Sequence, residues 1–308
     1  MTTATLDLSG DPRRHRRERL MRGVFFFSAA VSLLVSALIL VSLFSNGWTF
    51  FTDVVWSHVY DSSAWNPRQD QYSITTLLAG TGIVTGIALV VAAPLGLGAA
   101  VYLSEYARPR VRAVLKPILE VLAGIPSVVL GFFALQWIAP NLVGKLFGEE
   151  AGRGCSMMAA GIGVGILIVP LVASVSEDAM RAVPDALRQA SAGLGARRMS
   201  TSIRIVLPAA VSGIVAAFIL AASRAIGETM IVYIAGGASD TATFTSDPME
   251  GSLTMTAAMA SLAVGTDNVR GSGLAVESLY FVGIVLFGFT LILNIIGDRF
   301  VRRVRQAY

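Results

Sequence analysis

Six long stretches without a charged side chain constrain the fold of this chain more than any other feature. A helix needs about 20 mostly apolar residues to cross the roughly 30 Å of hydrocarbon in a bilayer. Each of the six stretches is 19 to 34 residues long and contains no Asp, Glu, Lys or Arg. They comprise residues 23–52, 71–104, 121–144, 154–176, 205–223 and 278–297. The sequence therefore predicts an all-α integral membrane protein with six transmembrane helices.

The composition argues against a soluble enzyme. Hydrophobic residues make up 54% of the chain and charged residues 14%, with a mean hydropathy of +0.67, which is far from the balance of soluble domains. One cysteine, Cys155, and two histidines, His15 and His58, are too few for a typical metal site or a Ser/His/Asp centre. A pI near 9.5 indicates nucleic-acid binding only where a soluble domain has a basic face. We expect no catalytic residue, metal, cofactor or nucleic-acid partner on this chain.

The basic residues predict the orientation in the membrane, because Lys and Arg near helix ends stay on the cytoplasmic side. With the N-terminus inside, 19 of the 24 Lys and Arg residues fall in inner segments, whereas four fall outside and Arg224 lies within a span. The four outer residues are Arg68, Lys145, Arg153 and Arg270. Both termini are therefore predicted to be cytoplasmic.

The first apolar run is interpreted as an uncleaved span. Residues 23–44 are too long for the apolar region of a typical signal peptide, and no A-x-A-like cleavage site follows them. We therefore divide the start of the chain into a basic cytoplasmic segment, 1–22, and a first transmembrane helix with its outer loop, 23–71. Residues 304–308 form a cytoplasmic tail.

Prolines interrupt several of the apolar runs. Pro94, Pro126 and Pro170 all fall inside predicted spans, where most such residues have an architectural role. Pro126 is the best candidate for a broken helix that lines a cavity, because it lies between flexible Gly124 and the hydroxyl of Ser127.

Arg224 and Glu228 are the charged residues within a span. The simplest interpretation is one fifth helix that carries both on the same face, because they are four residues apart. Intramembrane charges are costly and usually face a cavity or a partner, and a guanidinium group matches the oxygens of phosphate or carboxylate. Glu228 then pairs with Arg224 in the absence of substrate or accepts a proton from hydrogen phosphate; a purely structural ion pair is the alternative.

The inner segment 177–208 is predicted to be folded. Pro184 suits the first turn of a helix, Gly195 suits its end and Pro208 precedes the next span. A short helix with small side chains at the inner membrane face can insert into a groove on a partner. A simple connecting helix-turn-helix explains the same pattern equally well.

The inner segment resembles the EAA loop of ATP-binding-cassette (ABC) importer permeases, in which E-A-A is followed by three residues, G, nine residues and I-x-L-P. Gln189 stands where that family usually has glutamate. The positions that correspond to the motif are Gln189, Ala190, Ser191, Gly195, Ile205, Leu207 and Pro208. The resemblance implies that these residues dock into a cytoplasmic ATPase and that residues 72–303 form a type I importer transmembrane domain.

Three further stretches, 94–106, 122–129 and 224–230, resemble the high-affinity phosphate (Pst) permeases. The segments Trp65-Asn66-Pro67 and 277–294 resemble the PstC type more than its PstA sister. The resemblance implies a prokaryotic plasma-membrane location and a phosphate path that includes Arg224, Glu228, Ser127 and Thr229. The implied partners are a PstA-type permease, two copies of a PstB-type ATPase, a PstS-type phosphate-binding protein outside the cell, and the lipid bilayer.

Two other functions are compatible with the residues. In the first alternative, the importer carries another oxyanion, such as sulfate or molybdate. In the second alternative, the chain is a self-contained carrier or channel in which Arg224 and Glu228 relay protons or gate ions. The second alternative leaves the EAA-like pattern unexplained.

Overall fold

The computed structural model describes residues 12–60, 63–237, 241–264 and 274–305. Parts of three segments placed by the sequence analysis lie outside the described residues. They are residues 1–11 of the basic N-terminal segment, Arg270 and residues 306–308 of the tail. Within the described part of the chain, five helices are long and apolar enough to cross a membrane, or six if one bent pair counts as a single span. The prediction of a helical membrane protein is confirmed.

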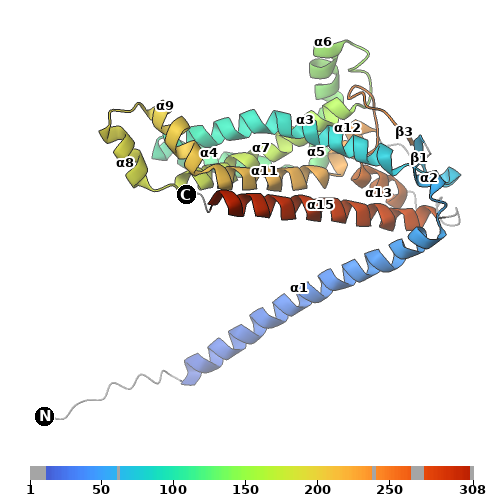
Figure 1. Ribbon diagram of the computed structural model, residues 1–308, viewed down its shortest axis with the longest axis horizontal. Helices are drawn as coiled ribbons and strands as arrows, with labels where there is room; N and C mark the ends of the chain where they lie inside the picture. The colour runs from blue at the N-terminus through green and yellow to red at the C-terminus, as the bar shows by residue number, and fades with distance from the viewer. Residues whose placement is uncertain (1–11, 61–62, 238–240, 265–273, 306–308) are drawn as a thin grey trace.

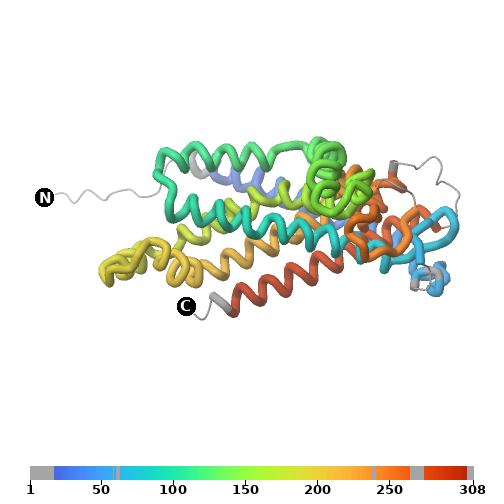
Figure 2. Tube along the Cα trace, turned by 90° about the horizontal axis from the view of Figure 1, so that it is seen from above, coloured from blue at the N-terminus to red at the C-terminus, as the bar shows by residue number. Residues whose placement is uncertain are grey.

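Long helices lie side by side in the main bundle (Figure 1). These are α3 (Ile74–Val101), α7 (Met157–Arg181), α11 (Val211–Ile226) and α15 (Ala275–Arg305). Helix α4 (Pro109–Ala123) runs along one edge and α15 along the other (Figure 2). The bundle therefore exposes α4 on a different side from α15.

Shorter elements complete the fold. The remaining α-helices are α2 (Ser57–Tyr60), α5 (Ser127–Phe133), α6 (Gly144–Phe147), α8 (Asp185–Gly193), α9 (Arg198–Thr201), α10 (Leu207–Ala209), α12 (Met230–Gly236) and α13 (Met255–Val264). Wider π-helical turns occupy Tyr102–Tyr106, Ala134–Val143 and Ser202–Val206, and a 3₁₀ turn occupies Pro67–Gln69. An antiparallel sheet in the order β2 (Gln71–Tyr72), β1 (Ala64–Asn66), β3 (Ala242–Thr243) lies at the opposite end of the molecule from α8 (Figure 1).

Glycines let α3 and α7 approach closely. A Cβ atom added to Gly165 would lie 2.8 Å from Cβ of Val91, and one added to Gly161 would lie 2.7 Å from Cβ of Ile87. Small residues at helix interfaces allow this approach in membranes, where van der Waals contact drives helix association. Gly161 and Gly165 of α7 thus have an architectural role at this interface.

Helix α1 (Pro12–Asp53) diverges from the bundle (Figure 1). The C-terminal part of α1 contacts the first part of α15. There the ring of Phe50 stacks on that of Phe281 with centroids 4.8 Å apart, and Gly47 lies against Ile284. The 18-residue window that best fits a span in α1 has no buried residues. The contacts of α1 with the bundle are thus concentrated at one end.

Of the three prolines named in the sequence analysis, one lies at a break between helices. Pro94 and Pro170 lie inside α3 and α7, which continue through them, so the expectation that they interrupt helical runs was wrong. Membrane helices tolerate proline where neighbouring groups satisfy the freed backbone carbonyl. Pro126 does separate two helices, α4 and α5, as predicted.

The fifth span is not one continuous helix. Helix α11 ends at Ile226, and α12 begins at Met230. At the break, the amide of Glu228 donates to the carbonyl of Ala225 at 3.2 Å, three residues back, and the hydroxyl of Thr256 donates to the carbonyl of Glu228 at 2.7 Å. This contact from a distant part of the chain satisfies the backbone where the helix is interrupted.

Candidate functional site

The EAA-like residues form a helix-turn-helix at one end of the bundle. Gln189 and Ala190 are exposed on α8, whereas Ser191 is buried and its hydroxyl shares a hydrogen bond of 2.8 Å with that of Thr201. Gly195 follows α8 with φ of +75°, the left-handed conformation that favours glycine after a helix. The predicted folded segment is confirmed, and its exposed face includes Gln189.

The end of the segment leads into α11 through a bend. Ile205 lies in the π-helical turn, and Leu207 and Pro208 lie in α10. All three are partly buried. The helical segment Arg198–Ala209 meets α11 at 69°, so the second half of the motif joins the exposed helix to a candidate span.

Arg188 ties α8 to the bundle. Its guanidinium group forms an ion pair with Glu105 at 3.0 Å and donates to the carbonyls of Met180 at 2.8 Å and Val183 at 2.7 Å. The side chain of Glu105 is 9% exposed, whereas Asp185, which also pairs with Arg188, is 84% exposed. Arg188 therefore connects the exposed helix to the ends of α3 and α7 at once.

Replacing Arg188 with glutamine is expected to weaken the attachment of α8. The change leaves the largely buried carboxylate of Glu105 without this partner, at a cost of about 1–3 kcal/mol. We expect the purified chain in detergent to melt at a lower temperature than wild type. Asp185→Asn, which removes only the exposed partner of the same arginine, is the matched control and should melt as wild type does. Equal melting of the two variants would contradict the attachment of α8 through the Arg188–Glu105 pair.

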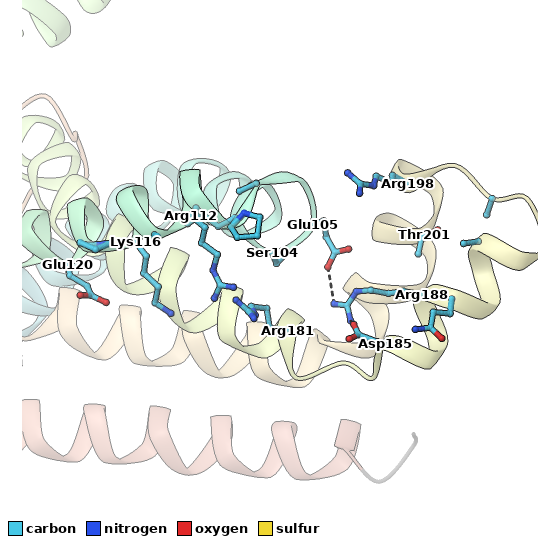
Figure 3. A pocket seen from close by; sticks show the side chains of 18 residues that line it. Ser104, Glu105, Arg112, Lys116, Glu120, Arg181, Asp185, Arg188, Arg198 and Thr201 are labelled. Atoms are coloured by element: carbon cyan, nitrogen blue, oxygen red, sulfur yellow. Dashed lines mark hydrogen bonds and ion pairs between the residues drawn. The ribbon is translucent and has the colours of Figure 1, made fainter.

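A cleft of about 950 Å³ lies between α4 and the EAA-like segment. Figure 3 shows Glu105 and Arg188 joined across it, with Arg112, Lys116 and Arg181 along its other wall. Charged side chains of both signs line this cleft, so its surface is polar at the end of the molecule that holds α8.

Arg224 is exposed on α11 and lines a second cavity of about 340 Å³. The residues around it come from α4, α7 and α11. They are Lys116, Leu119, Glu120, Ala123, Leu167, Pro170, Leu171, Ser174, Glu177 and Arg224. The cavity combines an apolar wall with two cations and two carboxylates, which is the setting expected for Arg224 on a polar path.

Three other predicted path residues lie elsewhere. Ser127 is the first residue of α5, and Thr229 precedes α12, which packs against α5. The carboxylate of Glu228 accepts a hydrogen bond from the amide of Ile231 at 3.4 Å and forms no ion pair with Arg224 among the described residues. The expectation of one helix with both side chains on the same face was wrong, because α11 ends at Ile226, before Glu228.

The sequence analysis missed the cluster around Glu177. This carboxylate is fully buried and makes ion pairs with Arg112, with Lys116 at 3.3 Å and with Arg181 at 4.0 Å. The available signal was the spacing of Glu177 and Arg181, which are four residues apart at the end of a charge-free stretch.

Lys116 links this cluster to a neighbouring carboxylate. Its ammonium group donates to Asp178 at 2.9 Å. This hydrogen bond and the negative charge of Glu177 raise the pKa of Lys116 above its ordinary value. Lys116 is therefore a fixed positive charge at neutral pH, located where the two cavities meet.

Comparisons with known proteins agree with the fold. Residues 92–306 match the family described as "Binding-protein-dependent transport system inner membrane component". The solved bacterial alginate ABC transporter has a chain that aligns with a TM-score of 0.67 at 13% identity, covering 95% of this chain and 97% of that one. A chain of the MetNI methionine ABC transporter aligns with a TM-score of 0.53 at 20% identity, covering 75% and 94%. These similarities show the helical fold of type I ABC importer permeases.

Several curated relatives are phosphate transport system permease proteins. The phosphate transport system permease protein PstC of Pasteurella multocida is 28% identical over 95% of this chain and 94% of its own length. PstC 1 of Mycobacterium bovis is 31% identical, covering 85% and 84%, and PstA 1 of Mycobacterium tuberculosis is 34% identical, covering 74% and 71%. The resemblance to phosphate permeases of the PstC type, stated from sequence motifs, is confirmed. The chain belongs to the family of binding-protein-dependent transport system inner membrane components, and it is a membrane-embedded permease subunit of an ABC importer.

Proposed function

We propose that this chain is the PstC-type permease subunit of an ATP-driven importer of inorganic phosphate and forms half of the translocation path. The observation that carries the proposal is the similarity to a PstC protein over nearly the whole length of both chains. The position of Arg224 on a cavity between α4, α7 and α11 supports it, because a guanidinium group binds phosphate oxygens through two parallel hydrogen bonds.

The partners of the importer are a sister permease of the PstA type, two PstB-type ATPases and an outer PstS-type binding protein. ATP hydrolysis takes place on the ATPases, and the chain itself performs no covalent chemistry. The exposed face of α8 with Gln189 and Ala190 is the surface that docks into an ATPase. A helix inserted into a groove is a common mode of recognition between proteins.

Both termini are on the cytoplasmic side in this proposal. The start of α1, the end of α15 and α8 lie toward the same end of the molecule (Figure 1), and the predicted inner segments carry most of the basic residues. Closure of the ATPases moves α8, and Arg188 transmits that movement to the ends of α3 and α7 through its hydrogen bonds and ion pair.

The test is phosphate-stimulated ATP hydrolysis by nanodiscs that contain this chain with its co-purifying partners and the binding protein. Wild type is compared with a variant in which residues 189–195 are scrambled. We expect phosphate to stimulate hydrolysis in the wild type and the scrambled chain to lose the ATPase during purification. Anion transport by the purified chain without an ATPase would overturn the proposal in favour of a self-contained carrier.

Substrate competition tests the cargo. Excess unlabelled phosphate is expected to block uptake of labelled phosphate in cells, whereas sulfate and molybdate should leave uptake unchanged. Stimulation of ATP hydrolysis by sulfate or molybdate, and not by phosphate, would assign the importer to another oxyanion.

A further inference from the structure

Thr256 holds the backbone at the break between α11 and α12. Because α11 ends at Ile226 and α12 begins at Met230, Glu228 belongs to neither helix. Its carbonyl needs a donor from elsewhere in the bundle, since a backbone group shielded from water is costly without a hydrogen bond. The hydroxyl of Thr256 is such a donor, at 2.7 Å, and its side chain is buried.

The direction of the hydrogen bonds around Thr256 follows from the chemistry of the groups. A carbonyl cannot donate, so the single hydroxyl proton of Thr256 points to Glu228. The hydroxyl of Thr254, which lies 3.1 Å from that of Thr256, must therefore donate to it. Thr254 in turn accepts from the amide of Ala257 at 3.3 Å. Each hydroxyl thus donates once and accepts once, which fixes the orientation of Thr256.

The segment that carries this threonine is anchored to two helices. The amide of Met255 donates to the hydroxyl of Thr81 on α3 at 3.0 Å. The amide of Ser252 donates at 3.0 Å to the carbonyl of Gly236, the last residue of α12. Residues 252–258 are buried without interruption, so the donor to the break has a place that is fixed by α3 and α12.

The break carries a carboxylate within a predicted span. The side chain of Glu228 is partly buried, and its carboxylate accepts a hydrogen bond from the amide of Ile231 at 3.4 Å. Ionisable side chains inside membrane segments are costly and usually line a path for a polar solute, and interrupted helices serve the same purpose in transporters. A movement of the backbone at Glu228 displaces its carboxylate, so the hydroxyl of Thr256 limits where that charge can lie.

We propose that Thr256 is a positioning residue, whose hydroxyl keeps the carboxylate of Glu228 at one place on the translocation path. The presence of Glu228 on that path rests on the proposed function, whereas the hold on the break rests on the hydrogen bonds. Without the hydroxyl, the backbone between Ile226 and Met230 samples more conformations. Glu228 then meets the solute in the right place less often, and each transport cycle is slower.

The experiment measures the initial rate of labelled phosphate uptake by cells, divided by the amount of importer that co-purifies with its ATPase. Thr256→Val keeps the shape of the side chain and removes the hydroxyl. It is expected to lower this rate about tenfold, the factor for one buried hydrogen bond. Thr256→Ser keeps the hydroxyl and should restore the rate. Thr85→Val, which removes a buried hydroxyl without a hydrogen-bond partner in the described part of the chain, is the matched control and should match wild type.

A double variant tests whether Thr256 acts through Glu228. Glu228→Gln alone is expected to lower the rate about tenfold, and adding Thr256→Val should lower it no further, because the positioned residue has already lost its charge. An equal factor from Thr256→Val in both backgrounds would overturn the positioning role. A wild-type rate in Glu228→Gln, or a rate in Thr256→Ser as low as in Thr256→Val, would overturn it as well. So would a loss of assembled importer with an unchanged rate per importer, which is the result of a purely structural role.

Hydrogen exchange tests the hold on the break without reference to the cargo. In the purified importer, the backbone amides of residues 227–231 should exchange about tenfold faster in Thr256→Val than in wild type, and at the wild-type rate in Thr85→Val. Equal exchange in Thr256→Val and wild type would overturn the hold on the break. Uptake by the same variants is also measured with labelled sulfate. If the expected changes appear with sulfate and wild type imports no phosphate, the positioning role stands and the proposed cargo is wrong.

Discussion

Replacing Arg224 with glutamine is expected to lower the rate of phosphate uptake by about a hundredfold or more. The reason is the loss of two charge-assisted hydrogen bonds to the anion, each of about 1.5 kcal/mol or more. The guanidinium group lies on the cavity between α4, α7 and α11 and has no acidic partner among the described residues. Its removal therefore takes away an interaction with the anion and leaves no buried carboxylate unpaired. The measurement is uptake of radiolabelled phosphate by cells that depend on this permease.

Membrane insertion and assembly serve as the control for that result. The amount of Arg224→Gln in the membrane fraction and its co-purification with an ATPase should match those of wild type. Arg153→Gln, which removes an exposed arginine whose one ion pair within the described part of the chain is with exposed Glu149, should transport normally. Uptake at the wild-type rate by Arg224→Gln would exclude Arg224 from the path.

Replacing Gly165 with leucine is expected to destabilise the bundle by about 3 kcal/mol, the upper part of the range for overpacked sites. A single added carbon at Gly165 already approaches Cβ of Val91 to 2.8 Å, so a leucine side chain forces α3 and α7 apart. The resulting gap removes van der Waals contacts along the interface that holds the two helices together.

Cys155, the only cysteine in the sequence, serves as a probe of this loss of stability. Cys155 is partly buried before the start of α7, and its thiol lies 3.6 Å from the carbonyl of Ile234. Labelling of Cys155 by a thiol-reactive dye during heating in detergent should occur at a lower temperature in Gly165→Leu than in wild type. Gly288→Ala, at a helical position with no atom near the added carbon, should be neutral or slightly stabilising. Equal melting of Gly165→Leu and wild type would contradict the close approach of α3 and α7.

The parts of the fold that the sequence predicted correctly depend on local chemistry. Charge-free stretches indicate spans because the bilayer penalises each buried charge. The helix that follows Pro184 and the left-handed turn at Gly195 are specified by the residues at those positions. Pro126 ends a helix for the same local reason.

The parts that were missed depend on contacts between distant residues. The break after Ile226 is satisfied by Thr256, which is 28 residues from Glu228, and Lys116 reaches Asp178 across 62 residues. Pro170 remains inside α7 because its neighbours in the bundle accommodate it. The placement of Arg224 on a cavity followed from the cost of its charge. Of its neighbours there, Lys116 had been counted only among the basic residues of the inner segments, and Glu177 had been interpreted only as the end of a charge-free stretch.

The divergence of α1 from the bundle has a consequence for biogenesis. A helix whose apolar surface is free of tertiary contacts over most of its length is stable in a bilayer before any other helix of this chain is present. The basic residues that precede its apolar run orient it during insertion. In the proposed orientation, the direction of the chain in the membrane is thus set by a helix that contributes few residues to the folded core, and the later helices assemble on a direction already chosen.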